Sequence, residues 1–156
     1  RETKPLGTGG AIKFAERHFR SNPVLVMNGD SRILFNFKNL HKIYFEKNCD
    51  AVILLSKNTK GTDYGNVTMD NKGRIYEFSE KPQTEFRSKF VNAGVYLFSR
   101  KLINKLPSNQ TISLEKDLMT FWLNKGKQIY GVIVNNPVLD IGTRDRYNNL
   151  KNTTMK

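Results

Sequence analysis

Hydrophobic residues along the chain fall into short continuous runs, separated by stretches in which apolar positions recur at helical spacing. Pro23–Met27 and Ala51–Leu55 are continuously apolar and are bounded by polar or glycine residues. This pattern is typical of strands that are buried on both faces of a sheet. Further strands are expected at Phe90–Phe98, at Gln128–Val134 and in a β-hairpin made of Asn66–Met69, the turn Asp70–Gly73 and Arg74–Phe78.

Helical spacing predicts a first helix that opens at Gly9–Gly10 and a second that contains Leu40 and Tyr44. Ser113 and Thr143 are suitable N-caps for later helices, because a hydroxyl accepts a hydrogen bond from a free backbone amide. Strands alternate with helices, so we predict an α/β fold with a mixed β-sheet sandwiched by helices, in one domain over residues 1–156. The later helices are expected at Lys101–Leu106, Leu114–Leu123 and Thr143–Leu150.

Composition adds a strongly basic balance. The chain has 26 Lys and Arg against 14 Asp and Glu, a formal net charge of +12. Such a charge suits a nucleic-acid-binding module, but the basic residues are scattered, with no run of four and no known nucleic-acid-binding motif. We interpret the charge as a solvated surface, with attraction of nucleotides as the functional alternative. We expect no nucleic-acid partner; salt-dependent DNA binding would contradict this.

The sequence also indicates a cellular setting. Its longest apolar runs fall far short of the roughly 20 residues that a membrane helix needs, and we expect no membrane partner. The single Cys49 has no second cysteine with which to form an internal disulfide. No base for a thiol nucleophile is identifiable, so we expect Cys49 to be a packing residue. A reduced, cytoplasmic location follows as the prediction.

The first segment with candidate chemistry runs from Glu2 through Pro5-Leu-Gly-Thr-Gly-Gly10 to Ile12. Glycines let a backbone approach a flat ligand closely, and the helix N-terminus behind them favours anionic groups. A glycine-rich turn is also an ordinary connector. Ligand-binding loops of this kind normally follow a strand, and none precedes Pro5, so we expect that an N-terminal segment is missing.

Two aspartates follow apolar segments, Asp30 in Met27-Asn-Gly-Asp30 and Asp140 in Asp140-Ile-Gly-Thr143. Ligands bind at the carboxyl ends of strands in open α/β sheets. A buried carboxylate needs a positive partner, and Mg²⁺ held by one or two carboxylates and substrate phosphates would supply it. The alternative is that each Asp caps a helix or turn. We expect the two side chains to converge on one cation, with neither committed to a permanent Arg or Lys.

Three further segments, spread over expected strands, have groups that suit a sugar phosphate: Tyr64-Gly65, Glu80-Lys-Pro82 and Asn92-Ala-Gly94-Val-Tyr96. Such a ligand needs a cation for its phosphate, hydrogen-bonding groups for its hydroxyls and room for its ring. Lys81 offers the first, Glu80 and Asn92 the second, and Gly65 and Gly94 the third. Each segment is ordinary by itself, and a Glu-Lys-Pro tripeptide is usually a surface strand end.

The order of these motifs resembles that of the sugar-1-phosphate nucleotidyltransferases, members of the nucleotidyl transferase superfamily. The resemblance covers about residues 2–147. Gly-Thr-Gly-Gly-Ala-Ile is similar to the D-glycero-D-manno-heptose 1-phosphate guanylyltransferases, whereas most mannose- and glucose-type relatives have Ala at the position of Gly9. The resemblance implies the Rossmann-like nucleotide-diphospho-sugar transferase fold, here without its first strand and helix.

The resemblance also implies the reaction, in which a sugar 1-phosphate and a nucleoside triphosphate, GTP with heptose 1-phosphate by the motif, give a nucleotide-sugar and pyrophosphate. It makes Asp30 and Asp140 the Mg²⁺ ligands and Lys81 the residue that holds the sugar phosphate, the three catalytic residues. Glu2 is a candidate acceptor for the guanine N1–H and amino group. The implied nucleotide-binding residues are Glu2, Leu6, Gly7, Thr8, Gly9, Gly10, Asn28 and Gly29, and the implied sugar-phosphate-binding residues are Tyr64, Gly65, Glu80, Lys81, Asn92 and Gly94.

The chain departs from the family in one respect. The signature Gly-Gly-x-Gly-Thr-Arg loop, which binds the triphosphate, is absent, so we expect these 156 residues alone not to turn over. A mannose-1-phosphate guanylyltransferase, a glucose-1-phosphate nucleotidyltransferase and a non-catalytic binding or regulatory domain remain alternatives. The implied pathway is the supply of activated sugar for cell-surface polysaccharide. The sequence leaves the base, the sugar and the oligomeric state open.

Overall fold

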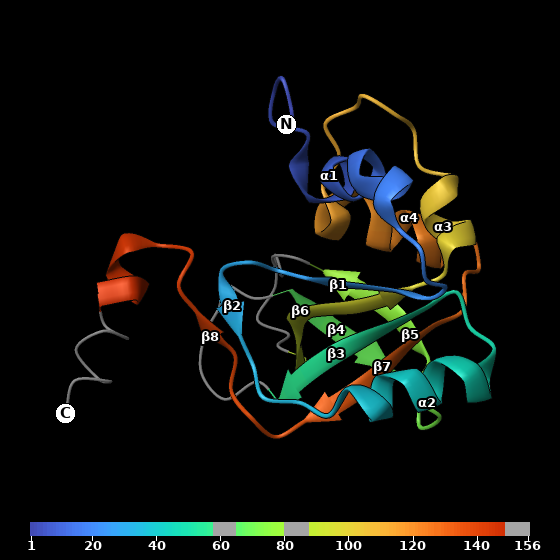
Figure 1. Cartoon of the computed structure of the whole chain (residues 1–156). Helices are drawn as coiled ribbons and strands as arrows, with labels where there is room; N and C mark the ends of the chain where they lie inside the picture. The colour runs from blue at the N-terminus through green and yellow to red at the C-terminus, as the bar shows by residue number, and fades with distance from the viewer. Residues whose placement is uncertain (58–64, 80–87, 149–156) are drawn as a thin grey trace.

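A computed structural model describes residues 1–57, 65–79 and 88–148 of the chain. A six-stranded mixed β-sheet forms its centre (Figure 1). β3 pairs in parallel with β7 and antiparallel with β6, and β6 pairs antiparallel with both β4 and β1. The strands are β1 (Val24–Met27), β3 (Ala51–Lys57), β4 (Asn66–Met69), β5 (Ile75–Ser79), β6 (Phe90–Phe98) and β7 (Ile129–Val134), in the order β5-β4-β6-β3-β7 with β1 beside β6.

Helices cover both faces of this sheet, which confirms the predicted sandwich (Figure 1). Among the described helices, α2 (Phe37–Lys47) covers one face. The opposite face is covered by α1 (Gly7–Ala15) with the 3₁₀ turn Glu16–His18, by α3 (Arg100–Asn104), and by the π-helical turn η2 (Leu114–Met119), which continues into α4 (Thr120–Asn124).

Alternate residues of the central strands feed two separate cores. Ile53 and Tyr96 are fully buried between the sheet and the α1, α3 and α4 layer, whereas Val52 and Leu97 pack with Leu40 of α2 on the other face. Burial of such a side chain stabilises the fold by about 1.5–3 kcal/mol. The continuous apolar pattern of Ala51–Leu55 therefore predicted correctly that β3 is buried on both faces.

The same prediction is wrong for β1. Its side chains alternate in burial, and Leu25 and Met27 are 41% and 49% exposed. The reason is the reach of α2, which packs on β3, β6 and β7 and leaves the end of the sheet at β1 uncovered. Within the described residues β6 is the one strand that pairs with β1, so the other edge of β1 is unpaired there.

Local signals placed the helix starts well. The Ser113 hydroxyl accepts from Lys116 N at 3.1 Å, and the Thr143 hydroxyl accepts from Arg146 N at 3.3 Å, where residues 144–148 are helical. Both predicted caps are confirmed. The helix expected over Leu114–Leu123 opens with a π-helical turn, which the apolar spacing did not predict.

The predicted hairpin is confirmed, with β4 antiparallel to β5. Asp70 closes its turn, because its carboxylate accepts from Arg74 N at 2.9 Å and Lys72 N at 2.8 Å. The Arg74 amide contributes most to lowering the pKa of the Asp70 carboxyl below its usual value. An amide hydrogen bond favours the charged form of a carboxyl group, and the turn is therefore best held when Asp70 is ionised.

A short element was not predicted. β2 (Ser31–Arg32) pairs antiparallel with β8 (Leu139–Asp140) as a separate two-stranded ribbon. Two residues per strand are too few for a period-2 pattern to appear in the sequence.

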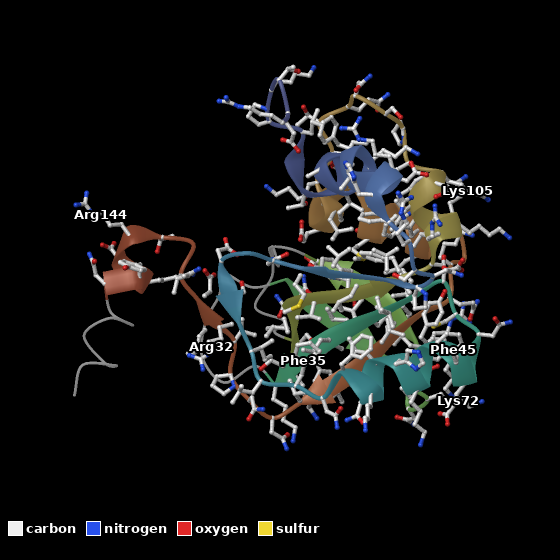
Figure 2. The ribbon with its side chains drawn as sticks, viewed as in Figure 1. Arg32, Phe35, Phe45, Lys72, Lys105 and Arg144 are labelled. Atoms are coloured by element: carbon white, nitrogen blue, oxygen red, sulfur yellow. The ribbon has the colours of Figure 1, made fainter. Side chains whose placement is uncertain are left out.

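The predictions about membrane-spanning helices and about the distribution of basic residues can be compared with the described residues. No helix there has the length and apolarity that a membrane crossing requires. Basic side chains are dispersed: Figure 2 shows Arg32, Lys72, Lys105 and Arg144 at widely separated points of the surface.

The reactivity of Cys49 tests whether its side chain is packed in the core. The thiol is 6% exposed, and desolvation raises its pKa to about 11 from an ordinary value of 9.0. The thiolate is the reactive form, so at pH 8 the folded protein should react with Ellman's reagent about 100-fold more slowly than the unfolded chain. Comparison of the rates with and without denaturant measures this. Equal rates would show that Cys49 is accessible and not part of the core.

Candidate functional site

The candidate site lies where two strands share one edge of β6. β3 pairs along the length of one edge, whereas β4 pairs with β6 at Val91 and β1 pairs with it from Val95 onward. Between these pairings, Asn92 N donates to Gly65 O and Asn28 N donates to Gly94 O, each at 2.8 Å. The edge of β6 at Asn92–Gly94 therefore faces the gap between the ends of β1 and β4.

The β2–β8 ribbon brings the two predicted aspartates to this gap. Ser31 lies opposite Asp140 in the ribbon, and Ile141 N donates to Asp30 O at 2.8 Å. A Cβ atom on Gly142 would lie 2.8 Å from Asp30 Oδ2 and 3.1 Å from Asp140 Oδ1. The two carboxylates thus face the same point, and a side chain at position 142 would have to displace at least one of them.

Asp140 has partners within its own segment. Gly142 N donates to Asp140 Oδ1 at 2.7 Å, and the Arg146 guanidinium forms an ion pair with Asp140 Oδ2. The side chains of Arg146 and Asp140 are 32% and 18% exposed. The convergence of the carboxylates agrees with the sequence prediction, which also expected that neither aspartate would have a permanent cation partner. Because the pair is partly open to solvent, it is not a buried and permanent one.

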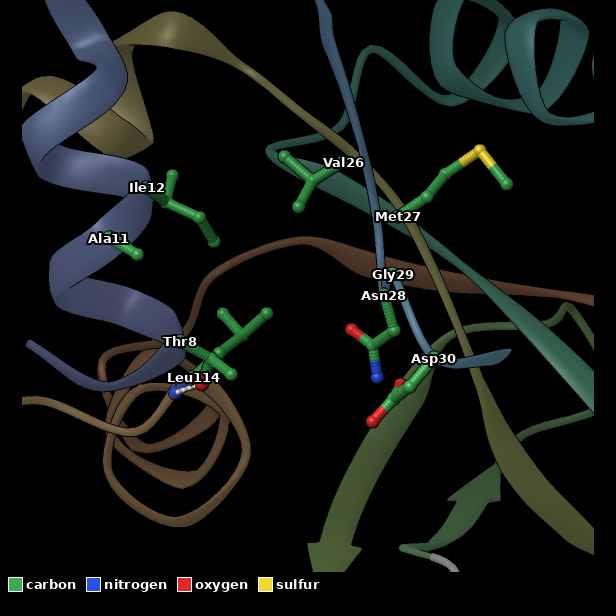
Figure 3. A pocket seen from close by; sticks show the side chains of 9 residues that line it. All are labelled: Thr8, Ala11, Ile12, Val26, Met27, Asn28, Gly29, Asp30 and Leu114. Atoms are coloured by element: carbon green, nitrogen blue, oxygen red, sulfur yellow. Dashed lines mark hydrogen bonds between the residues drawn. The ribbon is translucent and has the colours of Figure 1, made fainter. Parts of the chain in front are cut away.

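Two cavities meet beside these carboxylates and share Thr8, Asn28 and Asp30. The smaller, of about 260 Å³, is polar in character and contains both aspartates. The larger, of about 490 Å³, opens between α1 and β1, and Figure 3 shows Asn28 and Asp30 extending from the end of β1 toward it. The smaller cavity is lined by Thr8, Asn28, Asp30, Ser31, Gly65, Asn92, Ala93, Gly94, Glu115, Val138 and Asp140.

Gly94 has a different role from the one we expected. Its φ of +69° favours glycine, and a Cβ atom there would lie 2.8 Å from Asn28 Nδ2. The space above Gly94 is therefore taken by the Asn28 side chain and does not itself make room for a sugar ring. Gly94 instead places Asn28 at the cavity wall.

Packing within the protein accounts for the glycine loop. Gly9 N and Gly10 N both donate to Ile112 O, and Ile112 N donates to the carbonyl of Leu6. A Cβ atom on Gly10 would lie 2.5 Å from Gln110 O. These backbone groups are thus engaged by the 110–112 segment, and the connector alternative explains the glycines. Thr8 of this segment lines both cavities, and Ala11 and Ile12 line the larger one.

The other predicted residues fall into three groups. Glu2, Leu6, Gly7, Gly9 and Gly10 line neither cavity, and Leu6 is 6% exposed. Gly29 lines the larger cavity. Tyr64, Glu80 and Lys81 lie outside the described residues.

Glu115 is a site residue that sequence reasoning missed. Its carboxylate accepts from Thr8 Oγ1 at 2.8 Å and from the Tyr96 hydroxyl at 3.0 Å. Asn92 Nδ2 in turn donates to the Tyr96 oxygen at 2.6 Å. The one available signal was an acidic residue two positions after the Ser113 cap, which is ordinary in a first helical turn.

Glu115 sets the direction of this chain of hydrogen bonds. A carboxylate accepts hydrogen bonds and donates none, so the Tyr96 hydroxyl donates to Glu115 and accepts from Asn92. The Asn92 oxygen accepts from Gly94 N at 3.1 Å, which fixes the same amide orientation from the other side. Asn92 lines the smaller cavity, and the bond to Tyr96 uses one of its two amide hydrogens, which leaves the other as a candidate donor to a ligand.

The arrangement suits a hard cation and a polyhydroxylated anion. The described residues contain no cluster of three or more His, Cys, Asp or Glu side chains that could hold a metal. Two converging carboxylates fit a Mg²⁺ ion that takes its remaining ligands from water and substrate phosphate. They do not fit a metal enclosed by protein ligands alone.

Comparison with known sequences identifies relatives along the whole chain. The sequence model of the nucleotidyl transferase family matches residues 1–156. The mannose-1-phosphate guanylyltransferase catalytic subunit beta of Drosophila melanogaster is 32% identical over 143 residues, which are 90% of this chain and 38% of that protein. A UTP–glucose-1-phosphate uridylyltransferase of Synechocystis is 31% identical over 144 residues, 89% of this chain and 37% of that protein. The chain spans less than half the length of these relatives.

Solved structures show the same fold. HddC from Yersinia pseudotuberculosis superposes with a TM-score of 0.81 at 24% identity, over 98% of this chain and 64% of HddC. The same protein has also been solved complexed with GMP-PN. The predicted nucleotide-diphospho-sugar transferase fold is confirmed by this likeness.

The close approach at Gly142 leads to a prediction. Gly142→Ala should weaken Mn²⁺ binding at least about tenfold, because the new methyl group would separate the two carboxylates. Gly29→Ala is the matched control, since a Cβ atom at Gly29 would meet nothing within 4 Å. Free Mn²⁺ can be measured by electron paramagnetic resonance. Wild-type affinity in the Gly142→Ala protein would show that the carboxylates do not act together.

Proposed function

Because the chain belongs to the nucleotidyl transferase family, we propose that it carries the metal and sugar-phosphate side of a site that joins a nucleoside triphosphate to a sugar 1-phosphate. The products are a nucleotide-sugar and pyrophosphate. The observation that supports this most directly is the convergence of Asp30 and Asp140 at the wall of a polar cavity.

The reaction is an in-line displacement at phosphorus. The phosphate oxygen of the sugar 1-phosphate attacks the α-phosphorus, a new P–O bond forms, and the bond to the β-phosphate oxygen breaks as pyrophosphate leaves. In such transfers a protein contributes mainly positioning and charge neutralisation. Asp30 and Asp140 would hold Mg²⁺, which when bound would offset the repulsion between the two anionic substrates. Lys81 remains our predicted partner of the sugar phosphate.

Asn92 and Glu115 would orient the sugar. Asn92 is 9% exposed and offers an N–H group whose direction is set by Tyr96 and Glu115. A fixed donor at the cavity wall discriminates between hydroxyl positions, because an unmatched buried donor is costly. The proposed assignment thus separates into a metal pair, Asp30 and Asp140, and a sugar-binding wall made by Asn92 of β6 and Glu115 of η2.

Guanine is the base and heptose the sugar that we propose first. The heptose assignment rests on the Gly-Thr-Gly-Gly-Ala-Ile segment, and guanine is the base transferred by the Drosophila relative according to its name. Mannose 1-phosphate is an equally supported sugar, because that relative is a mannose-1-phosphate guanylyltransferase. The uridylyltransferase of Synechocystis is almost as similar to this chain as the Drosophila protein is, so UTP is tested beside GTP.

Binding tests this proposal, because it does not require the triphosphate loop. Calorimetry with heptose, mannose and glucose 1-phosphates, and with GTP, UTP, dTTP and ATP, should show binding that depends on Mg²⁺. Asp30→Asn and Asp140→Asn should each weaken the metal-dependent part about ten- to hundredfold. Asp70→Asn removes the same charge in the distant hairpin turn and should bind as the wild type does.

Three outcomes would count against the proposal. One is an absence of Mg²⁺-dependent binding to every sugar phosphate and nucleotide. Another is equal binding by the wild type and the Asp30→Asn protein. The third is binding in which the Asp70→Asn control loses as much affinity as the site variants, since the effect would then be one of overall charge.

Glu115 gives a separate prediction about the sugar. In Glu115→Gln the new amide can donate to the Tyr96 hydroxyl, which reverses the chain and turns the Asn92 oxygen toward the cavity. Sugar 1-phosphate should then bind about three- to tenfold more weakly, whereas Mn²⁺ affinity without sugar should not change. Glu77→Gln in the hairpin is the control. Unchanged sugar affinity in both Glu115→Gln and Tyr96→Phe would show that this chain does not orient a ligand.

A further inference from the structure

We propose that Arg146 is the internal counter-ion of the paired carboxylates. Its guanidinium neutralises Asp140 in the metal-free protein and gives up that carboxylate oxygen when a divalent cation binds. The proposal rests on the proposed function of Asp30 and Asp140 as metal ligands, and it gives this chain a residue that sets how tightly the metal is held.

The carboxylate of Asp140 is shared between two kinds of contact. Its Oδ1 accepts from Gly142 N at 2.7 Å and lies on the side that faces Asp30. Its Oδ2 forms the ion pair with Arg146 Nη1. A cation that bound both oxygens of Asp140, or that lay between the two aspartates, would lie close to the Arg146 guanidinium and repel it.

The metal-free pair of aspartates requires such a partner. Two carboxylates that face one point repel each other, and a neighbouring cation offsets that repulsion. The Arg146 guanidinium is the cation seen paired with either of them within the described part of the chain. Because an arginine stays charged at any working pH, this neutralisation is always present.

The position of Arg146 allows it to withdraw. The residue lies in the helical turn at 144–148, where its backbone amide is held by the Thr143 hydroxyl at 3.3 Å. The side chain is 32% exposed, so the guanidinium can move toward water and remain solvated after it leaves Asp140. The exchange therefore leaves a solvated guanidinium, and its cost includes the loss of one partly exposed ion pair.

Removal of the Arg146 guanidinium, which competes with the metal for Asp140, should tighten metal binding. We expect Arg146→Gln to bind Mn²⁺ about three- to tenfold more tightly than the wild type when no nucleotide is present, with Mg²⁺ affinity raised equally in competition. Arg144→Gln is the matched control. It removes the same charge from the same helical turn, and Figure 2 shows Arg144 on the outer side of that turn, away from the sheet. Its Mn²⁺ affinity should stay within about twofold of the wild-type value.

A chemical measurement follows the exchange without any substitution. Phenylglyoxal modifies accessible guanidinium groups, and mass spectrometry reports the rate at each arginine. Saturating Mn²⁺ should raise the modification rate of Arg146 several-fold and leave that of Arg144 unchanged, because binding of the metal and release of Arg146 are linked.

The results separate this proposal from the one on which it rests. If Arg146→Gln binds Mn²⁺ equally or more weakly while Asp140→Asn loses binding, Asp140 is a metal ligand and Arg146 does not compete with the metal. Protection of Arg146 by Mn²⁺ would overturn the proposal in the same way, because it would show that the guanidinium stays on the occupied site. If Asp140→Asn binds Mn²⁺ as the wild type does, the assignment of the metal ligands itself fails.

Discussion

The pairing of β2 with β8 is the contact on which the candidate site depends. It places Asp140 opposite Ser31, and with the hydrogen bond from Ile141 N to Asp30 O it holds two segments from distant parts of the sequence in one register. Alternation along a strand is strict, so a slip of one residue would turn Asp140 away from Asp30. Gly142 then leaves the space in which the two carboxylates face each other.

The sheet supplies the other half of the site through a shared edge. β6 gives one edge to β3, with a register shift between Ile53 and Leu55, and divides the other between β4 and β1. Divergence of those two strands exposes Asn92–Gly94 to a cavity inside an otherwise packed sheet. The polarity of the hydrogen bonds from Asn92 through Tyr96 to Glu115 then gives this wall a defined donor, which a set of independent polar side chains would not have.

Charge balance connects the two halves. Glu115 is satisfied by hydroxyl donors from Thr8 and Tyr96, whereas Asp140 is satisfied by a guanidinium and a backbone amide. In our proposal, a carboxylate held by neutral hydroxyls serves orientation, and one held by a partly solvent-exposed guanidinium can exchange it for a metal. This difference in partners separates the proposed role of Glu115 from that of Asp140 in the same cavity.

The sequence by itself determined what short-range physics controls. Apolar runs and spacing predicted β3, β6, the hairpin and the helices, and a hydroxyl at the right place predicted the Ser113 and Thr143 caps. The tertiary structure decided the features that arise between distant segments: the β2–β8 ribbon, the exposed face of β1, the packing of the glycine loop on residues 110–112, and the partners of Glu115 and Asp140. A local pattern records which side chains prefer burial or a turn, but it does not record which two segments will meet. That depends on the closing of long loops and on which faces the helices cover.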